Sequence, residues 1–130
     1  MTEPFVYVGT WTIKPGKFEE ARKWLAEHVD FIETNEPRLI AFHVYFDAEG
    51  RTASVVQVHP DSASMEFHMQ LIAEHLSGAF DVIDAIVSEQ YYGPMSDSLA
   101  KTLSEWETPG VTVIKMPVHE AGFTRLNAAR

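Results

Sequence analysis

The sequence predicts an α+β fold in which helices cover one side of a single sheet. Two runs rich in β-branched and aromatic residues, 38–46 and 53–59, flank a short turn that contains Gly50, as expected for a β-hairpin. From Phe18 onward, apolar residues recur at three- and four-residue steps, which indicates an amphipathic helix. Strand and helix patterns continue to alternate after the hairpin. We therefore predict the order β-α-β-β-α-β.

The first half of the chain is predicted to form a strand, a helix and the hairpin. Residues 5–13 alternate along the run, and the Pro15-Gly16 pair that follows ends the strand. The helix from Phe18 should end near residue 35 or 36, because Pro37 disfavours helical geometry in the residue before it. The hairpin then occupies residues 38–59.

The second half begins with another helix. Asp61 or Ser62 is placed to cap that helix, and Gly78 is expected to interrupt it. One or two helical turns at 80–85 should lead into a fourth strand at 86–92.

A third helix and a short last strand follow. Ser96 or Asp97 can cap the helix, and residues 111–116 form the strand. The complete pattern is a ferredoxin-like βαββαβ sheet with an added C-terminal helix and strand. We expect one domain over residues 1–130, with a core at about 5–92 and an extension at about 93–130.

The composition is that of an acidic protein without cysteine. The 130 residues include 10 Lys+Arg and 19 Asp+Glu, a net charge of −9 that argues against nucleic acid or an anionic membrane as partner. The absence of cysteine excludes disulfides, thiolate nucleophiles and cysteine zinc sites. No secretory pattern opens the chain, and no apolar run approaches the roughly 20 residues of a membrane span. We therefore expect a cytoplasmic location.

The predicted topology leaves one face of the sheet bare. Both crossovers are right-handed, so the helices fall on the same side. We expect the other face to carry six large apolar or aromatic side chains: Phe5, Tyr7, Trp11, Leu39, Tyr45 and Val55. Burying such a surface is worth about 25 cal/mol per Å². We therefore predict a face-to-face homodimer, a dimeric α+β barrel.

Two strand faces of mixed character suggest a ligand site. If these faces coincide, His43, Tyr45, Gln57 and His59 share one surface. His43 and His59 are then candidate catalytic bases, since an unperturbed histidine has a pKa of about 6.5. Alternatively, His43 hydrogen-bonds within a dimer interface and His59 only ends a strand before a proline.

Three segments carry a resemblance to a known family. They are Tyr7-Val-Gly-Thr-Trp-Thr-Ile-Lys-Pro-Gly-Lys-Phe-Glu-Glu-Ala21, Gln57-Val-His-Pro-Asp-Ser62, and the helix that holds His68 and His75. Over residues 5–92 the chain resembles the antibiotic biosynthesis monooxygenase-like family of dimeric α+β barrels. The resemblance implies an oxygenase that acts on a polycyclic phenol without metal or flavin, or a protein that opens haem.

The resemblance also suggests roles for individual residues. Trp11 would form an aromatic wall, and His68 or His75 would serve as a base or haem ligand. Seven residues separate these two histidines, so they share a helix face, where half-exposed structural rings are the alternative. Tyr7 and Tyr45, with His68 and His75, are candidate substrate-binding residues, although the aromatic side chains equally suit a core or interface.

Three functions stay open from the sequence. The first is a cofactor-independent monooxygenase for an aromatic or quinol-type substrate, the second a non-catalytic ligand-binding or stress-associated barrel, and the third haem binding or degradation. His43, His59 and Asp61 are the residues that could form a two-histidine, one-carboxylate metal site, but the compact spacing of metal motifs is absent. We expect no metal, a small apolar or aromatic ligand, and a second copy of the chain as partner.

Overall fold

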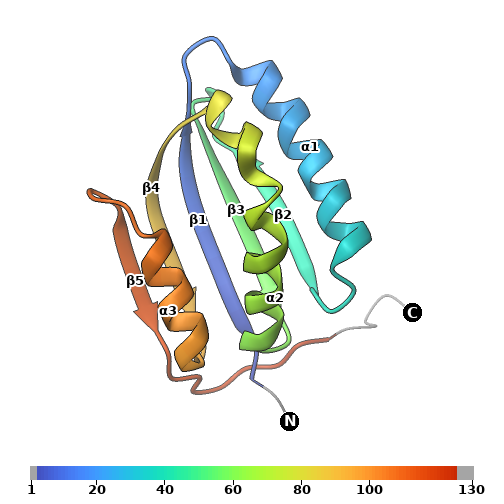
Figure 1. The fold of residues 1–130 in the computed structure, drawn as a ribbon, viewed down its shortest axis with the longest axis vertical. Coiled ribbons are helices and arrows are strands. Elements are labelled where there is room, and N and C mark those ends of the chain that lie inside the picture. Colours follow the sequence, from blue (N-terminus) through green and yellow to red (C-terminus); the bar gives the residue numbers. More distant parts are fainter. Residues whose placement is uncertain (1–2, 126–130) are drawn as a thin grey trace.

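A computed structural model describes residues 3–125. The elements are β1 (Phe5–Ile13), α1 (Phe18–Asn35), β2 (Ala41–Phe46), β3 (Thr52–His59), α2 (Ser62–Ala73), the 3₁₀ helix η1 (Leu76–Asp81), β4 (Ile83–Tyr92), α3 (Asp97–Trp106) and β5 (Thr112–Met116). The strand order is β2-β3-β1-β4-β5, and only the β4–β5 pair is parallel. The helices lie on one side of this sheet (Figure 1). The predicted ferredoxin-like class, with its C-terminal helix and strand, is confirmed.

The local signals in the sequence account for the ends of the helices. α1 ends at Asn35, two residues before Pro37, as predicted. The Asp61 side chain caps α2 by accepting a hydrogen bond from the Ser64 amide at 3.0 Å. The Ser96 hydroxyl caps α3 by accepting from the Leu99 amide at 3.1 Å.

Two strands differ from their predicted bounds. β2 begins at Ala41 rather than at residue 38, because the Leu39 amide turns back to the Glu36 carbonyl. β4 begins at Ile83 rather than at residue 86, because β1 continues to pair with it as far as Ile13. Two shifts of register in this pairing accommodate the longer strand.

The assignment of side chains to the two faces of the sheet corrects the prediction. Phe5, Tyr7, Trp11 and Val55 lie on the face that the helices cover, not on the open face. Leu39 packs against the same core. Strand alternation separates two faces but does not say which one the helices cover, and here they cover the face with the larger aromatic side chains. Of the predicted set, Tyr45 projects from the open side, at 59% exposure.

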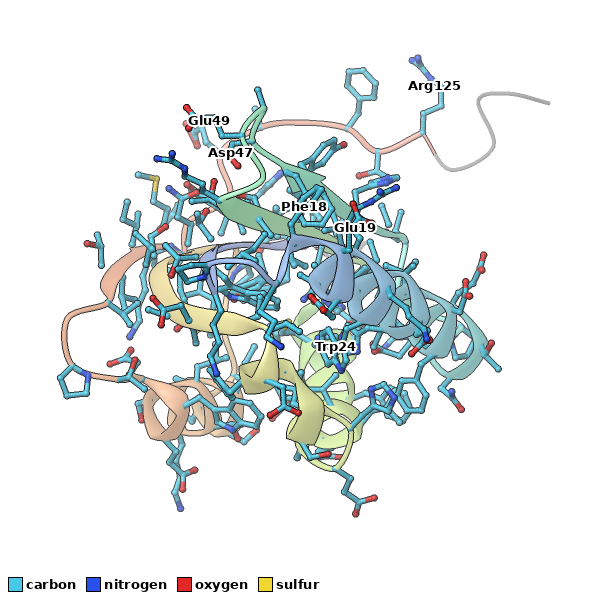
Figure 2. The ribbon with its side chains drawn as sticks, turned by 90° about the horizontal axis from the view of Figure 1, so that it is seen from above. Phe18, Glu19, Trp24, Asp47, Glu49 and Arg125 are labelled. Atoms are coloured by element: carbon cyan, nitrogen blue, oxygen red, sulfur yellow. The ribbon has the colours of Figure 1, made fainter. Side chains whose placement is uncertain are left out.

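The open face is nevertheless partly apolar. It carries Val6 and Val8 of β1 beside Val56 and Val58 of β3. Seen from above, α2 and α3 lie on one side of the sheet, and the segment that leads to Arg125 runs past the other (Figure 2). The predicted extension beyond residue 125 lies outside the described residues.

No helix among residues 3–125 has the length and apolar character needed to cross a bilayer.

Candidate functional site

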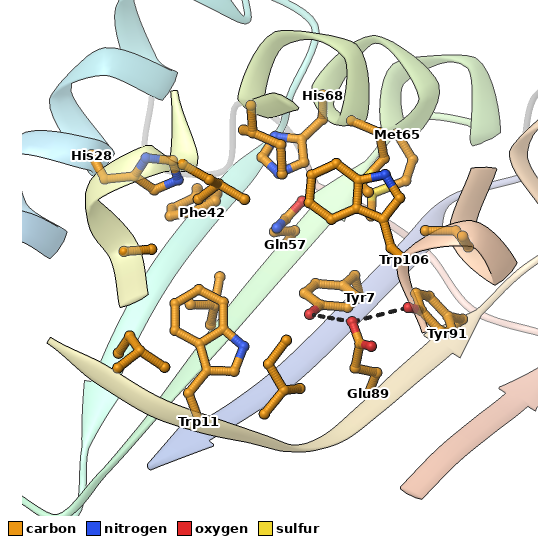
Figure 3. A pocket seen from close by; sticks show the side chains of 18 of the residues that line it. Tyr7, Trp11, His28, Phe42, Gln57, Met65, His68, Glu89, Tyr91 and Trp106 are labelled. Carbon is orange, nitrogen blue, oxygen red and sulfur yellow. Dashed lines mark hydrogen bonds between the residues drawn. The ribbon is translucent and has the colours of Figure 1, made fainter. Parts of the chain in front are cut away.

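The site is a cavity of about 280 Å³ between the covered face of the sheet and α2, η1 and α3 (Figure 3). Most of its lining is apolar, and a few polar side chains converge on it: His28, Gln57, His68, Glu89 and the hydroxyl groups of Tyr7 and Tyr91. A mainly apolar cavity with a few fixed polar groups is typical of small-molecule sites.

The first polar group is a carboxylate held by two tyrosines. The Tyr7 and Tyr91 hydroxyls donate to Glu89 Oε2 at 3.0 and 3.1 Å, as the dashed lines in Figure 3 show. The sheet register produces this arrangement, because Tyr7 is paired with Tyr91 and Glu89 lies opposite Gly9. The Tyr7 side chain therefore reaches along its own strand to meet the carboxylate.

Gly9 makes room for this contact. A Cβ atom at Gly9 would lie 2.1 Å from the Tyr7 hydroxyl oxygen, far closer than non-bonded atoms approach. Glycine is therefore required here by the close passage of a side chain.

Burial and the negative charge of Glu89 raise the pKa of both tyrosines, that of Tyr7 well above its usual value. Both hydroxyls therefore keep their protons at neutral pH and remain hydrogen-bond donors to the carboxylate. These two bonds give the buried Glu89 side chain hydrogen-bond partners in an apolar setting.

The second polar group is the amide of Gln57, which is oriented by a buried relay. His59 Nδ1 lies 2.8 Å from Ser64 Oγ, and His59 Nε2 lies 2.9 Å from Gln57 Oε1. Burial lowers the pKa of His59 to about 3, so its ring is neutral and has one donor and one acceptor nitrogen. In the assignment that satisfies both contacts, Ser64 donates to Nδ1, and Nε2–H donates to the Gln57 carbonyl. This leaves the amide hydrogens of Gln57 for the cavity.

The third group is a buried pair of His68 and Glu36. His68 Nδ1 lies 2.6 Å from Glu36 Oε2, and the two side chains are 2% and 1% exposed. Because a carboxylate accepts, Nδ1 carries the hydrogen, and in the neutral ring Nε2 then has the lone pair. Among the described residues, no hydrogen bond to Nε2 is found. His68 lines the cavity, so this ring belongs both to the buried pair and to the cavity wall.

A column of stacked rings connects α1 with the residue that precedes η1, and one of its members, His28, lines the cavity. Trp24, His28, His75 and Phe31 stack in that order, and Nδ1 atoms of the two histidines lie 3.2 Å apart. Burial and the nearby His75 and His68 lower the pKa of His28 to about 4. The His28 ring is therefore neutral at pH 7. The stacked rings pack α1 against His75, which follows α2.

The structure separates the four residues predicted to share one surface. His43 and Tyr45 lie on the open face, whereas Gln57 and His59 are buried under the helices. The register explains this correction, because Gln57 is paired with Phe42 rather than with His43. His43 therefore lies outside the cavity, and both ring nitrogens of His59 are already engaged.

The other predicted site residues divide in the same way. Tyr7, Trp11 and His68 line the cavity, whereas His75 is stacked on Phe31 and does not. Within residues 3–125, no cluster of three or more His, Asp or Glu side chains could hold a metal ion. The set His43, His59 and Asp61 is not assembled, because His43 lies on the opposite face.

Sequence reasoning missed Glu36 and Glu89. Glu36 was considered only as a helix end before Pro37, although its fully buried side chain is the partner of His68. Glu89 faces the helices from within a strand that also carries Tyr91. Its chain neighbours are Ser88 and Gln90, so the sequence around it gives no local signal that its carboxylate is buried.

The sequence matches no family model and no curated protein. Among solved structures, MupZ from Pseudomonas fluorescens superposes with a TM-score of 0.76 at 20% identity, over 96% of this chain and 91% of that chain. A protein from Caulobacter crescentus CB15 that is described as an antibiotic biosynthesis monooxygenase gives a TM-score of 0.61 at 16% identity, over 69% and 88%. A protein with the same description from Chloroflexus aurantiacus J-10-fl gives a TM-score of 0.59 at 14% identity, over 72% of this chain and 95% of that chain.

The chain has the antibiotic biosynthesis monooxygenase-like fold. The resemblance noted in the sequence is thus confirmed at the level of the fold. The match to MupZ covers nearly the whole chain, so it includes the C-terminal helix and strand. The two monooxygenase-like structures match about seven tenths of the chain.

Proposed function

We propose that the protein binds a small aromatic molecule in the cavity and oxidises it as a cofactor-independent monooxygenase of phenols or quinols. The observation that carries this proposal is the buried His68–Glu36 pair at the wall of an apolar cavity. The fold shared with monooxygenase-like structures supports it.

The site supplies the groups that such a reaction needs. His68 Nε2 takes the proton of a phenol or enol hydroxyl, and Glu36 stabilises the imidazolium that forms. The Gln57 amide donates a hydrogen bond to the resulting oxyanion, and the His59–Ser64 relay holds that amide in place. The apolar lining keeps water from quenching the anion before it reacts with dioxygen. The substrate itself is the reductant: one oxygen atom replaces a ring C–H hydrogen and gives the quinone, and the other leaves as water with that hydrogen and a hydroxyl hydrogen of the substrate.

Haem fits this cavity poorly. Its volume of about 280 Å³ is below the roughly 300–1,000 Å³ of drug-sized ligand pockets, and a porphyrin is at least as large as such ligands. The His75 ring is covered by Phe31 at a centroid distance of 3.7 Å. We therefore do not propose haem binding at either predicted histidine.

We also propose that the functional unit is a homodimer joined through the open sheet face. Val8 and Val56 are neighbours at the centre of this face, and the helices lie on the opposite side of the sheet. Covering such a patch with a twofold copy removes apolar surface from water.

Oxygen uptake with 1,4-dihydroxynaphthalene tests the proposed reaction. The wild-type protein should accelerate uptake over the rate in buffer, and His68→Gln should lower the rate at least about 100-fold, the usual contribution of a general base. His43→Gln, the same change on the open face, should keep the wild-type rate.

Two results would contradict the proposal. An unchanged rate in His68→Gln would remove His68 as the base. Saturable binding of 1-naphthol, seen as a change in tryptophan fluorescence, with no oxygen uptake would instead assign a non-catalytic ligand-binding role.

A further inference from the structure

Glu89 has no role in the chemistry proposed at His68, although it lies in the same cavity. Its side chain is 8% exposed. None of the ion pairs among the described residues involves it, and no Lys or Arg lines the cavity. A buried carboxylate without a cationic partner is costly, so such groups are usually paired.

The two tyrosines use only half of the hydrogen-bond acceptor positions of the Glu89 carboxylate. An ionised carboxylate offers about four acceptor positions. The Tyr7 and Tyr91 hydroxyls occupy two of them, both at Oε2. The remaining positions are available to a donor from a ligand.

The walls around Glu89 are aromatic. The Tyr7 and Tyr91 rings have centroids 5.4 Å apart, and the indoles of Trp11 and Trp106 line the same cavity (Figure 3). The faces of such rings attract cations, and Trp is the most effective of them. A carboxylate within aromatic walls favours a protonated amine over a neutral hydroxyl group, because only the amine gains from both features.

We propose that the cavity takes a ligand with a protonated amine, which binds Glu89 between the aromatic walls. The inference rests on the proposed function in one respect, that the same cavity holds the substrate. Gln57 lies on β3 and Glu89 on β4, on either side of β1, so about 10 Å of sheet separates the two strands. A phenolic arylalkylamine carries a group for each end of this span: its hydroxyl lies toward His68 and Gln57, and its ammonium group binds Glu89.

Paired probes of equal size test the inference. 1-Naphthylmethylamine, which is protonated at pH 7.5, and the neutral 1-naphthalenemethanol would be titrated calorimetrically into the wild-type protein. We expect the amine to bind at least about tenfold more tightly. Glu89→Gln should abolish this preference and leave alcohol binding within about twofold. Glu74→Gln, the same charge change at the exposed residue that follows α2, should preserve it.

The outcomes separate this inference from the proposed function. Equal binding of the two probes to the wild type would overturn the amine site, as would a preference that survives Glu89→Gln. In either case oxygen uptake with 1,4-dihydroxynaphthalene would still report on the oxygenase. Failure of both probes to bind would also overturn the amine site. The wild-type comparison needs no variant, so equal binding of the two probes overturns the amine site even if Glu89→Gln does not fold.

Discussion

At the scale of single residues, Gly9 leaves space for the side chain of a larger neighbour, Tyr7. Its missing Cβ lets the Tyr7 ring lie along β1 and reach Glu89 on the next strand. The hydrogen bond from Tyr7 to the Glu89 carboxylate therefore depends on glycine two residues further along β1, opposite Glu89.

Gly9→Ala should displace the Tyr7 hydroxyl, because the new methyl group would lie 2.1 Å from it. We expect a loss of about 1–3 kcal/mol in the free energy of unfolding, the usual cost of overpacking. Urea denaturation would measure it. Thr10→Ala, the neighbouring residue on the other face, serves as the control and should cost less. Equal stability of Gly9→Ala and the wild type would contradict the close packing.

The buried histidines make the stability of the protein depend on pH. The pKa values of His59 and His28 are lowered to about 3 and about 4, so the unfolded chain binds these protons more readily than the folded one. Their contribution is complete above a pH of about 6.5 and is lost as the pH falls toward these values.

Between pH 7 and pH 5, each of these histidines should lower the free energy of unfolding by about 2 kcal/mol. Urea denaturation at the two pH values measures the sum. His59→Gln should reduce the difference by about one histidine's share, and His43→Gln, an exposed histidine, should not change it. A difference that is the same in His59→Gln and the wild type would show that His59 is not buried in its neutral form.

At the scale of elements, the sequence was sufficient where a local signal existed. Pro37, Asp61 and Ser96 each act within a few residues, and the helices end or begin where these residues predict. β2 and β4 were less well placed, because their first residues depend on hydrogen bonds to partners elsewhere in the chain.

The candidate site was predictable only in part, for a physical reason. Strand alternation pointed to Gln57, aromatic character to Tyr7, and the family resemblance to Trp11 and His68, and all four line the cavity. Their grouping depended on strand register and on which face the helices cover, neither of which alternation alone determines. Contacts such as Tyr7 to Glu89 and Glu36 to His68 join residues 82 and 32 positions apart.

At the scale of the whole molecule, the two faces of the sheet differ: helices cover one, and the other is open. The covered face and its helices enclose the cavity, and the open face presents valines and Tyr45 to solvent. Val118 and Phe123 of the C-terminal segment are each 81% exposed, which adds to the apolar surface without a partner in one chain. Exposed apolar patches mark interaction surfaces, so the proposed dimer contact is placed on this face.

The proposed homodimer predicts a mass of about twice 14.7 kDa by light scattering at micromolar concentration. Val8→Asp places a charge at the centre of the open face, next to Val56, and should convert the dimer to a monomer because an unpaired charge is costly to bury. Ala100→Asp, on an exposed position of α3, is the matched control and should remain dimeric. A wild-type mass of 14.7 kDa, or a dimer that persists in Val8→Asp, would show that the open face is not the interface.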